Sequence, residues 1–119
     1  MPSIPKSKSE TDYLDRALKI QTILDQLLTR FTTFSGRSDA SRVVLIITGY
    51  EVVNKLLYVF TLDLELQKSI DEVMNKSVES MDETPPSILK NFRLVQSVLQ
   101  RLKKRADWWV LQSKKNAKG

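Results

Sequence analysis

The residues most able to take part in binding lie in the last third of the chain, where basic side chains gather around a tryptophan. Residues 86–119 hold nine Lys and Arg and one acidic residue, whereas residues 1–85 hold ten basic and 13 acidic residues. On a helix, these basic side chains fall opposite the apolar ones, on the same side as Trp108. A tryptophan beside cations is typical of a site that meets lipid headgroups, because an indole suits a mixed polar and apolar medium. The predicted contact residues are Lys90, Arg93, Leu94, Arg101, Lys104, Arg105 and Trp108.

This charge asymmetry indicates an anionic partner, either an anionic lipid surface or an acidic protein surface. Each basic residue near an anionic leaflet contributes on the order of 1 kcal/mol, and we expect Lys103 to join its neighbours in such an anchor. Other interpretations stay open: a solvated helix face, a calmodulin target, or packing of Trp108 on the N-terminal segment or on a second copy. Nucleic acid is not an expected partner, since no reading motif or set of stacking aromatics accompanies the charge.

The chain has no histidine and no cysteine, which removes several kinds of catalytic and metal site. Histidine general bases, Ser-His-Asp and Cys-His nucleophiles, and thiolate or imidazole metal sites all need one of these residues. The carboxylates of residues 71–83 are expected on a solvent-facing side of a helix, and Gly36 and Gly49 belong to no phosphate-binding loop. We therefore predict a non-enzymatic protein with no cofactor and no metal.

Helical periodicity runs through most of the chain and predicts an all-α protein, an antiparallel bundle of about four helices. A first helix is expected from Ser9 to Phe34, with an apolar stripe wide enough to contact two neighbours. A third helix is expected over residues 64–81. The last helix has the strongest pattern, in which apolar positions alternate steps of four and three: Ile88, Phe92, Val95, Leu99, Leu102, Ala106 and Trp109.

The segment from Val43 to Phe60 is apolar nearly all round and is therefore predicted to be the central helix of the core. Residues 42–48 are rich in β-branched side chains and also fit a strand, but no clear second strand exists to pair with them. Glu51 and Lys55 lie in the middle of this segment and argue against a membrane span.

Three breaks separate these elements. Gly36 is a candidate left-handed residue at the end of the first helix, and Ser38 is a candidate cap for the second. Residues 61–63 are expected to form a turn or a kink. Pro85 and Pro86 are expected to end the third helix, with Thr84 or Ser87 capping the fourth.

A chain of 119 residues fits one domain, because a single hydrophobic core saturates only well above this size. We expect a disordered leader over residues 1–8, one helical domain over residues 9–113 and a basic tail over residues 114–119. The N-terminal residues lack the apolar core of a secretory signal. The protein is therefore expected inside the cell, in the cytosol or on the cytosolic face of a membrane.

Residues 28–39, which read Leu-Thr-Arg-Phe-Thr-Thr-Phe-Ser-Gly-Arg-Ser-Asp, resemble a segment of the peroxisome-elongating peroxin-eleven family. In the N-terminal half of that family an apolar helix runs into a small-residue Gly-Arg turn, and a second apolar helix and a basic amphipathic segment follow. Residues 43–57 and 89–105 have similar layouts, so the resemblance covers about residues 20–108. It implies a helical protein on the cytosolic face of peroxisomes that inserts amphipathic helices to curve the membrane. It names no catalytic residue.

Together these features predict a helical interaction module whose basic C-terminal amphipathic helix contacts an anionic membrane surface or an acidic partner. Peroxisome membrane remodelling is the form of this function that the resemblance implies. The alternative is a soluble adaptor that dimerises or binds a partner helix through Trp108 and Leu94.

Overall fold

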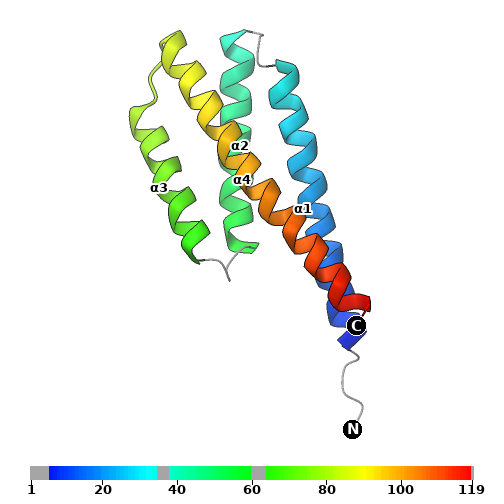
Figure 1. The fold of residues 1–119 in the computed structure, drawn as a ribbon. Coiled ribbons are helices and arrows are strands. Elements are labelled where there is room, and N and C mark those ends of the chain that lie inside the picture. Colours follow the sequence, from blue (N-terminus) through cyan, green and yellow to red (C-terminus); the bar gives the residue numbers. More distant parts are fainter. Residues whose placement is uncertain (1–5, 35–37, 60–63, 119) are drawn as a thin grey trace.

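The computed structural model describes residues 6–34, 38–59 and 64–118, and nearly all of them are helical. The four helices are α1 (Lys6–Phe34), α2 (Asp39–Val59), α3 (Leu64–Ser80) and α4 (Pro85–Lys118). Successive helices run antiparallel (Figure 1). The predicted all-α bundle is therefore confirmed, and residues 42–48 belong to a helix.

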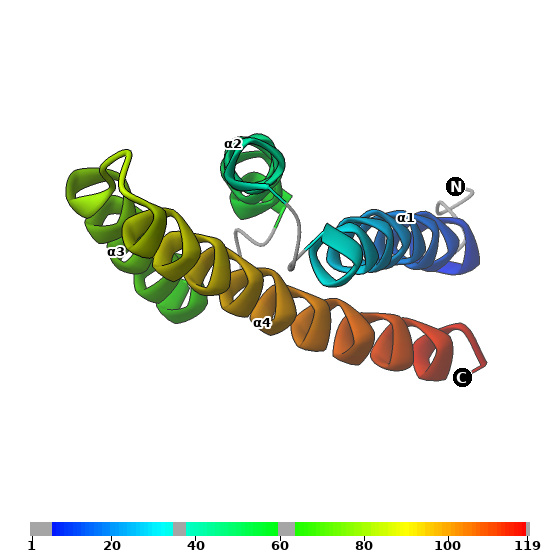
Figure 2. The same ribbon diagram turned by 90° about the horizontal axis from the view of Figure 1, so that it is seen from above.

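The central helix of the bundle is α4, and the prediction that α2 has this role is wrong. Each of the other three helices packs against α4, and α1 also packs against α2. Seen from above, α1 and α2 lie on one side of α4, and α3 lies on the other side, next to its yellow N-terminal part (Figure 2). One face of α2 remains at the surface, where the side chains of Val44 and Ile47 are 56% and 50% exposed. With 34 residues, α4 is the longest helix, and its length of about 51 Å lets it reach all three neighbours.

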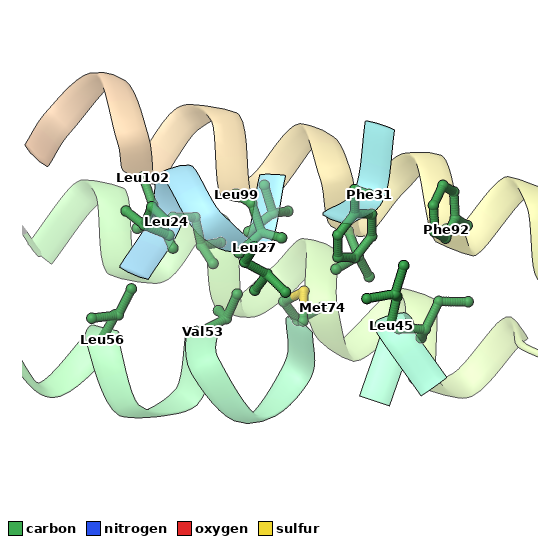
Figure 3. Packing of buried hydrophobic residues seen from close by; sticks show 14 of the residues in the cluster. Leu24, Leu27, Phe31, Leu45, Val53, Leu56, Met74, Phe92, Leu99 and Leu102 are labelled. Carbon is green, nitrogen blue, oxygen red and sulfur yellow. The ribbon is translucent and has the colours of Figure 1, made fainter. Parts of the chain in front are cut away.

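The core follows the apolar seam that the sequence of α4 predicts. Side chains of α1, α2 and α4 meet in a row along the bundle (Figure 3). The rings of Phe31 and Phe92 stack with their centroids 4.6 Å apart. The seam residues from Ile88 to Ala106 are buried, and Trp109 is partly buried against the same cluster.

Gly49 marks the point where α2 comes closest to α4. A Cβ atom at this position would overlap the Val95 side chain, and it would lie 3.5 Å from Cζ of Phe31. The helix continues through Gly49 without interruption. The glycine therefore does not break the helix but allows the two helices to pack closely.

A chain of buried polar side chains ties α3 to α2 and α4. The Ser77 hydroxyl donates to Oδ1 of Asn91 at 2.5 Å, and the Tyr50 hydroxyl lies 2.6 Å from the Ser77 hydroxyl. Because Ser77 has only one hydroxyl proton, Tyr50 is the donor in the second bond. Nδ2 of Asn91 donates to the backbone oxygen of Ser87 at 2.9 Å. Ser77 and Asn91 are each only 1% exposed, so these bonds satisfy groups that water does not reach.

The helix boundaries confirm one predicted cap, and they place the two prolines at the start of α4 instead of at the end of α3. Ser38 caps α2, because its hydroxyl accepts a bond from the Ser41 backbone N–H. Pro85 and Pro86 are the first two residues of α4, where a helix has no partner for the N–H groups that proline lacks. The Thr84 hydroxyl donates to the Asp82 carboxylate, and the Ser87 hydroxyl accepts from the Asp82 N–H. The role predicted for Gly36 and the turn or kink predicted over residues 61–63 lie outside the described residues.

The two end helices are longer than predicted. α1 begins at Lys6, inside the expected leader, and α4 continues through Lys118, inside the expected basic tail. Neither extension contains Gly or Pro, and lysines near a helix C-terminus interact favourably with the helix dipole.

The molecule is elongated, because α1 and α4 extend together past the other two helices (Figure 1). Its principal extents are 63 × 27 × 18 Å, and its Cα radius of gyration is 16.8 Å. A compact domain of this length has a radius of gyration of about 13.5 Å. The start of α1 and the end of α4 thus lie together at one end of the molecule.

Candidate anion-binding face

One side of α4 carries most of the predicted contact residues at exposed positions. Its exposed positions recur at steps of three and four, which places them on one face of the helix. We call this set the outer face of α4: Lys90, Arg93, Ser97, Arg101, Lys104, Trp108, Leu111 and Lys115. From Lys90 to Lys115 it spans about 38 Å of helix.

The outer face holds five cations and no acidic residue. Within the described residues, Lys90, Arg93 and Lys104 form no ion pair with a carboxylate. The Arg101 guanidinium donates to the Ser69 hydroxyl of α3 at 2.9 Å, a neutral partner that leaves its charge uncompensated. A row of positive charge therefore faces outward along most of α4.

Two large apolar side chains interrupt this row near the end of α4. Trp108 is 48% exposed and Leu111 is 52% exposed, and they are three residues apart on the same face. The guanidinium of Arg105 lies over the Trp108 ring, 4.2 Å from its centroid, which is a cation–π contact. The predicted exposure of Trp108 beside basic residues is confirmed.

Two residues predicted to belong to this site lie elsewhere. Leu94 is partly buried against the core. Leu94 is seven residues from Arg101 and therefore lies on the same edge of α4. At this edge the hydrogen bond from Arg101 to Ser69 joins α4 to α3. Lys103 is also largely covered, with 19% of its side chain exposed, because it faces α1.

Lys103 belongs to a polar contact that joins the extended parts of α1 and α4. Its Nζ lies 2.7 Å from Oδ1 of Asp107 and 3.2 Å from Oδ1 of Asp25. Nε2 of Gln21 donates to the same Asp107 oxygen at 2.7 Å. Asp107, the single acidic residue of α4, is thereby turned toward α1 and away from the outer face.

These contacts move two pKa values in opposite directions. The hydrogen bond to Asp107 raises the pKa of Lys103 above its ordinary 10.5 against the effect of burial. Burial raises the pKa of the Asp107 carboxyl, but hydrogen bonds from Gln21 and Lys103 outweigh it and hold that pKa below 3.8. Both groups are therefore charged over the physiological pH range.

The carboxylates of α3 and of the turn that follows it are exposed, in keeping with the solvent-facing side expected for them: Asp71, Glu72, Glu79, Asp82 and Glu83. No group of acidic side chains among the described residues is arranged to hold a metal ion. A hydrogen bond from the Thr84 hydroxyl holds the pKa of Asp82 below its ordinary value, which is a local effect of the turn. None of the described helices is both long and apolar enough to cross a membrane.

The sequence alone did not single out Leu111 and Lys115. Leu111 lies three residues after Trp108, and this spacing could have placed it on the outer face. Lys115 was assigned to a tail, and its place on the face becomes clear only because α4 continues to Lys118.

Comparisons of this chain with family models, with curated proteins and with solved structures found no match. The resemblance to the peroxin-eleven family therefore stays a prediction. The class that the structure itself defines is an elongated, four-helix, all-α protein with one basic helical face.

Proposed function

We propose that this protein binds anionic membrane surfaces through the outer face of α4. In this proposal the cations of the face meet lipid headgroups, and Trp108 and Leu111 enter the boundary between headgroups and acyl chains. The protein acts as a peripheral interaction module and catalyses no reaction.

The observation that carries the proposal is the combination of charge and apolar side chains on one uncovered helix face. Five Lys and Arg near an anionic leaflet supply on the order of 5 kcal/mol, which alone corresponds to a dissociation constant of about 0.2 mM. Burying the exposed parts of Trp108 and Leu111 adds about 2 kcal/mol. The sum corresponds to a dissociation constant of about 10 μM, so both parts are needed for useful binding.

Vesicle co-sedimentation tests this proposal. The whole chain is mixed with phosphatidylcholine vesicles that either contain or lack phosphatidylserine, at low and at high salt. We expect pelleting with the anionic vesicles alone, and release as salt screens the charges. An Arg101→Gln, Lys104→Gln, Arg105→Gln variant, which removes two cations of the outer face and the guanidinium over Trp108, should lose most of this binding.

A matched control removes the same amount of charge elsewhere on the surface. Lys55, Lys68 and Lys76 are exposed on α2 and α3, and a triple Gln variant at these positions should still bind. Circular dichroism melting checks that both variants stay folded. Equal loss of binding in the two variants would mean that net charge, and not the outer face, is responsible. Binding of wild-type protein to neither vesicle would overturn the proposal and favour an acidic protein as the partner.

Tryptophan fluorescence tests the apolar part of the site. Trp108 is half-exposed while Trp109 packs against the core, so a Trp109→Phe variant retains the indole of the outer face. Its emission should shift to the blue when anionic vesicles are added. In a Trp108→Phe variant the emission should stay nearly constant.

We further propose the peroxisomal membrane as the surface that this face meets in cells, on the strength of the peroxin-eleven resemblance. A fluorescently tagged chain should then coincide with a peroxisomal marker, and the variant lacking the three cations should become diffuse. Coincidence with a different anionic membrane would remove the peroxisomal assignment and leave membrane binding in place.

A further inference from the structure

Four cations of the outer face are arranged in pairs around one small side chain, that of Ser97. Lys90 and Arg93 lie seven and four residues before it, and both are exposed. Arg101 and Lys104 lie four and seven residues after it and are also exposed. Four residues turn a helix to within about 40° of the starting direction and seven to within about 20°, so these side chains leave α4 on one side. We call Ser97 and these four cations the Ser97 site.

The hydroxyl of Ser97 is exposed and forms no hydrogen bond with another described residue. On α1, by contrast, the exposed hydroxyls of Thr22, Thr29 and Thr33 donate to the backbone oxygen four residues earlier. The Ser97 hydroxyl is therefore available to an acceptor outside the protein. Because serine is short, such an acceptor can also come close to the helix at this point, between longer side chains.

The guanidinium of Arg101 is held in place before any ligand binds. One of its N–H groups donates to the Ser69 hydroxyl of α3 at 2.9 Å. A guanidinium has several N–H donors, so this bond leaves others for a ligand. The bond also restricts the motion of the side chain, which lowers the cost of ordering that side chain on binding. Long side chains on a helix lean toward its N-terminus, which favours an approach of Arg101 to Ser97.

Within the described part of the chain, the four cations of the Ser97 site form no ion pair with a carboxylate. The single acidic residue of α4, Asp107, is turned toward α1. On α3, Glu65 and Glu72 flank Ser69 at a spacing of about one turn, but neither pairs with Arg101. An anion that enters the Ser97 site therefore displaces water and no protein group.

The groups of the Ser97 site suit a phosphomonoester better than a phosphodiester. A phosphomonoester carries a charge of about −1.5 to −2 near pH 7 and three oxygens that accept hydrogen bonds strongly. The phosphodiester of an ordinary phospholipid carries less charge and fewer such oxygens. Two guanidinium groups can each give paired hydrogen bonds to a phosphate, and the flanking ammonium groups act as point charges.

We propose that the Ser97 site binds a lipid headgroup that carries a phosphomonoester. The inference rests on the proposed function, because the outer face of α4 must meet a membrane, and it adds a preferred lipid. Ser97 and Trp108 are eleven residues apart. This spacing returns to within about 20° of the same direction and places the two side chains about 16 Å apart along the helix. The headgroup site and the tryptophan therefore face the same surface.

Co-sedimentation with vesicles of matched surface charge tests the site. Phosphatidylcholine vesicles contain either phosphatidylserine or phosphatidylinositol 4-phosphate, and one phosphoinositide replaces about three phosphatidylserines. We expect half-maximal pelleting of the whole chain at an about tenfold lower lipid concentration with the phosphoinositide, because paired hydrogen bonds add to the charge attraction. Equal pelleting with the two kinds of vesicle would overturn this inference and leave the proposed function in place.

An Arg93→Lys, Arg101→Lys variant keeps every charge of the outer face and removes its planar guanidinium groups. It should bind phosphatidylserine vesicles as the wild type does and lose the preference for the phosphoinositide. An Arg16→Lys, Arg30→Lys variant makes the same change at two exposed positions of α1 and should keep the preference. A preference that survives in the first variant would come from charge alone and would contradict the site.

Ser97→Glu fills the site from within. Its carboxylate lies one turn from Arg93 and one turn from Arg101, where it pairs with them in place of a ligand. The phosphoinositide preference should disappear, whereas Gln26→Glu, which adds the same charge at an exposed position of α1, should retain it. Circular dichroism melting checks that the variants stay folded. Retention of the preference in Ser97→Glu would also overturn the inference.

Soluble inositol 1,4-bisphosphate distinguishes a membrane lipid from a free phosphate as the ligand. Titrated into isotope-labelled protein, it should shift the amide signal of Ser97 with a dissociation constant at least about tenfold weaker than that for the vesicles, because it lacks the contribution of Trp108. Equal affinity would assign the site to a soluble phosphate and overturn the lipid assignment. Failure of wild-type protein to bind either kind of vesicle would overturn the proposed function, and this inference with it.

Discussion

At the scale of single residues, Ser77 joins three helices through its buried hydrogen bonds. The sequence places Ser77 on the apolar face of its helix, where a small polar residue gives no sign of its partners. Its bonds to Tyr50 and Asn91 depend on residues 27 and 14 positions away, and periodicity cannot connect them.

Replacing Ser77 with alanine should lower the free energy of unfolding by about 1–3 kcal/mol. The change removes the donor to the Asn91 carbonyl and the Ser77 acceptor of the Tyr50 hydroxyl, and Ser77 and Asn91 are each only 1% exposed. Urea denaturation measures the effect. Ser97→Ala, at an exposed position of α4, serves as the control and should change stability by less than about 0.5 kcal/mol. Similar losses in both variants would contradict the role of the polar chain.

Gly49 gives a second prediction at this scale. The effect of Gly49→Ala on stability should change sign with the size of residue 95, which lies opposite Gly49. In wild-type protein, Gly49→Ala gains about 1 kcal/mol of helix propensity but overlaps Val95, and overpacking costs about 1–3 kcal/mol. We expect a net loss of about 1 kcal/mol. In a Val95→Ala background the overlap is gone, and the same substitution should stabilise. Thermal or urea unfolding of the four proteins checks this, and a loss in both backgrounds would contradict it.

At the level of the helices, the sequence predicts faces well and partners poorly. The regular spacing from Ile88 to Ala106 correctly identifies the buried side of α4, because a helix buries positions that recur every three or four residues. The sequence carries no such signal for the number of neighbours that a helix contacts. α2 is more apolar than α4, yet Val44 and Ile47 stay exposed because α4 is long enough to take the central position.

The same contrast between well-predicted faces and poorly predicted partners applies to the candidate site. Lys90, Arg93, Arg101 and Trp108 could be assigned to the outer face from their angles on an ideal helix. Lys103 and Leu94 could not, because they lie at the edges of that face, where the position of a neighbouring helix decides whether a side chain is covered.

The contact between the extended parts of α1 and α4 should depend on pH. The pKa of Asp107 is lowered, so its contribution to stability is present above about pH 4 and is lost as the pH falls through the lowered value. The pKa of Lys103 is raised, so its contribution is present below 10.5 and is lost as the pH rises through the raised value. Between these limits both groups stabilise the contact.

Asp107→Asn should therefore destabilise the protein near pH 7 and have a smaller effect at acidic pH, below the lowered pKa of Asp107. Because the Asp107 side chain is 46% exposed, the loss at neutral pH should be only about 0.5 kcal/mol. Urea denaturation at the two pH values measures it, with Asp15→Asn on an exposed part of α1 as the control. An equal loss at both pH values would point to packing instead of charge.

The shape of the whole molecule gives a prediction that needs no substitution. Small-angle X-ray scattering at low concentration should give a radius of gyration near 16.8 Å and a distance distribution with a tail toward the longest extent of 63 Å. A value near the 13.5 Å expected of a compact domain would contradict the joint extension of α1 and α4.

The central position of α4 also determines when this protein can fold during its synthesis. α4 is the last of the four helices to leave the ribosome, and the other three all pack against it. Until it emerges, apolar side chains such as Phe31 and Ile46 lack the surface that covers them in the folded state. Nascent α1, α2 and α3 are therefore exposed to aggregation until translation reaches α4.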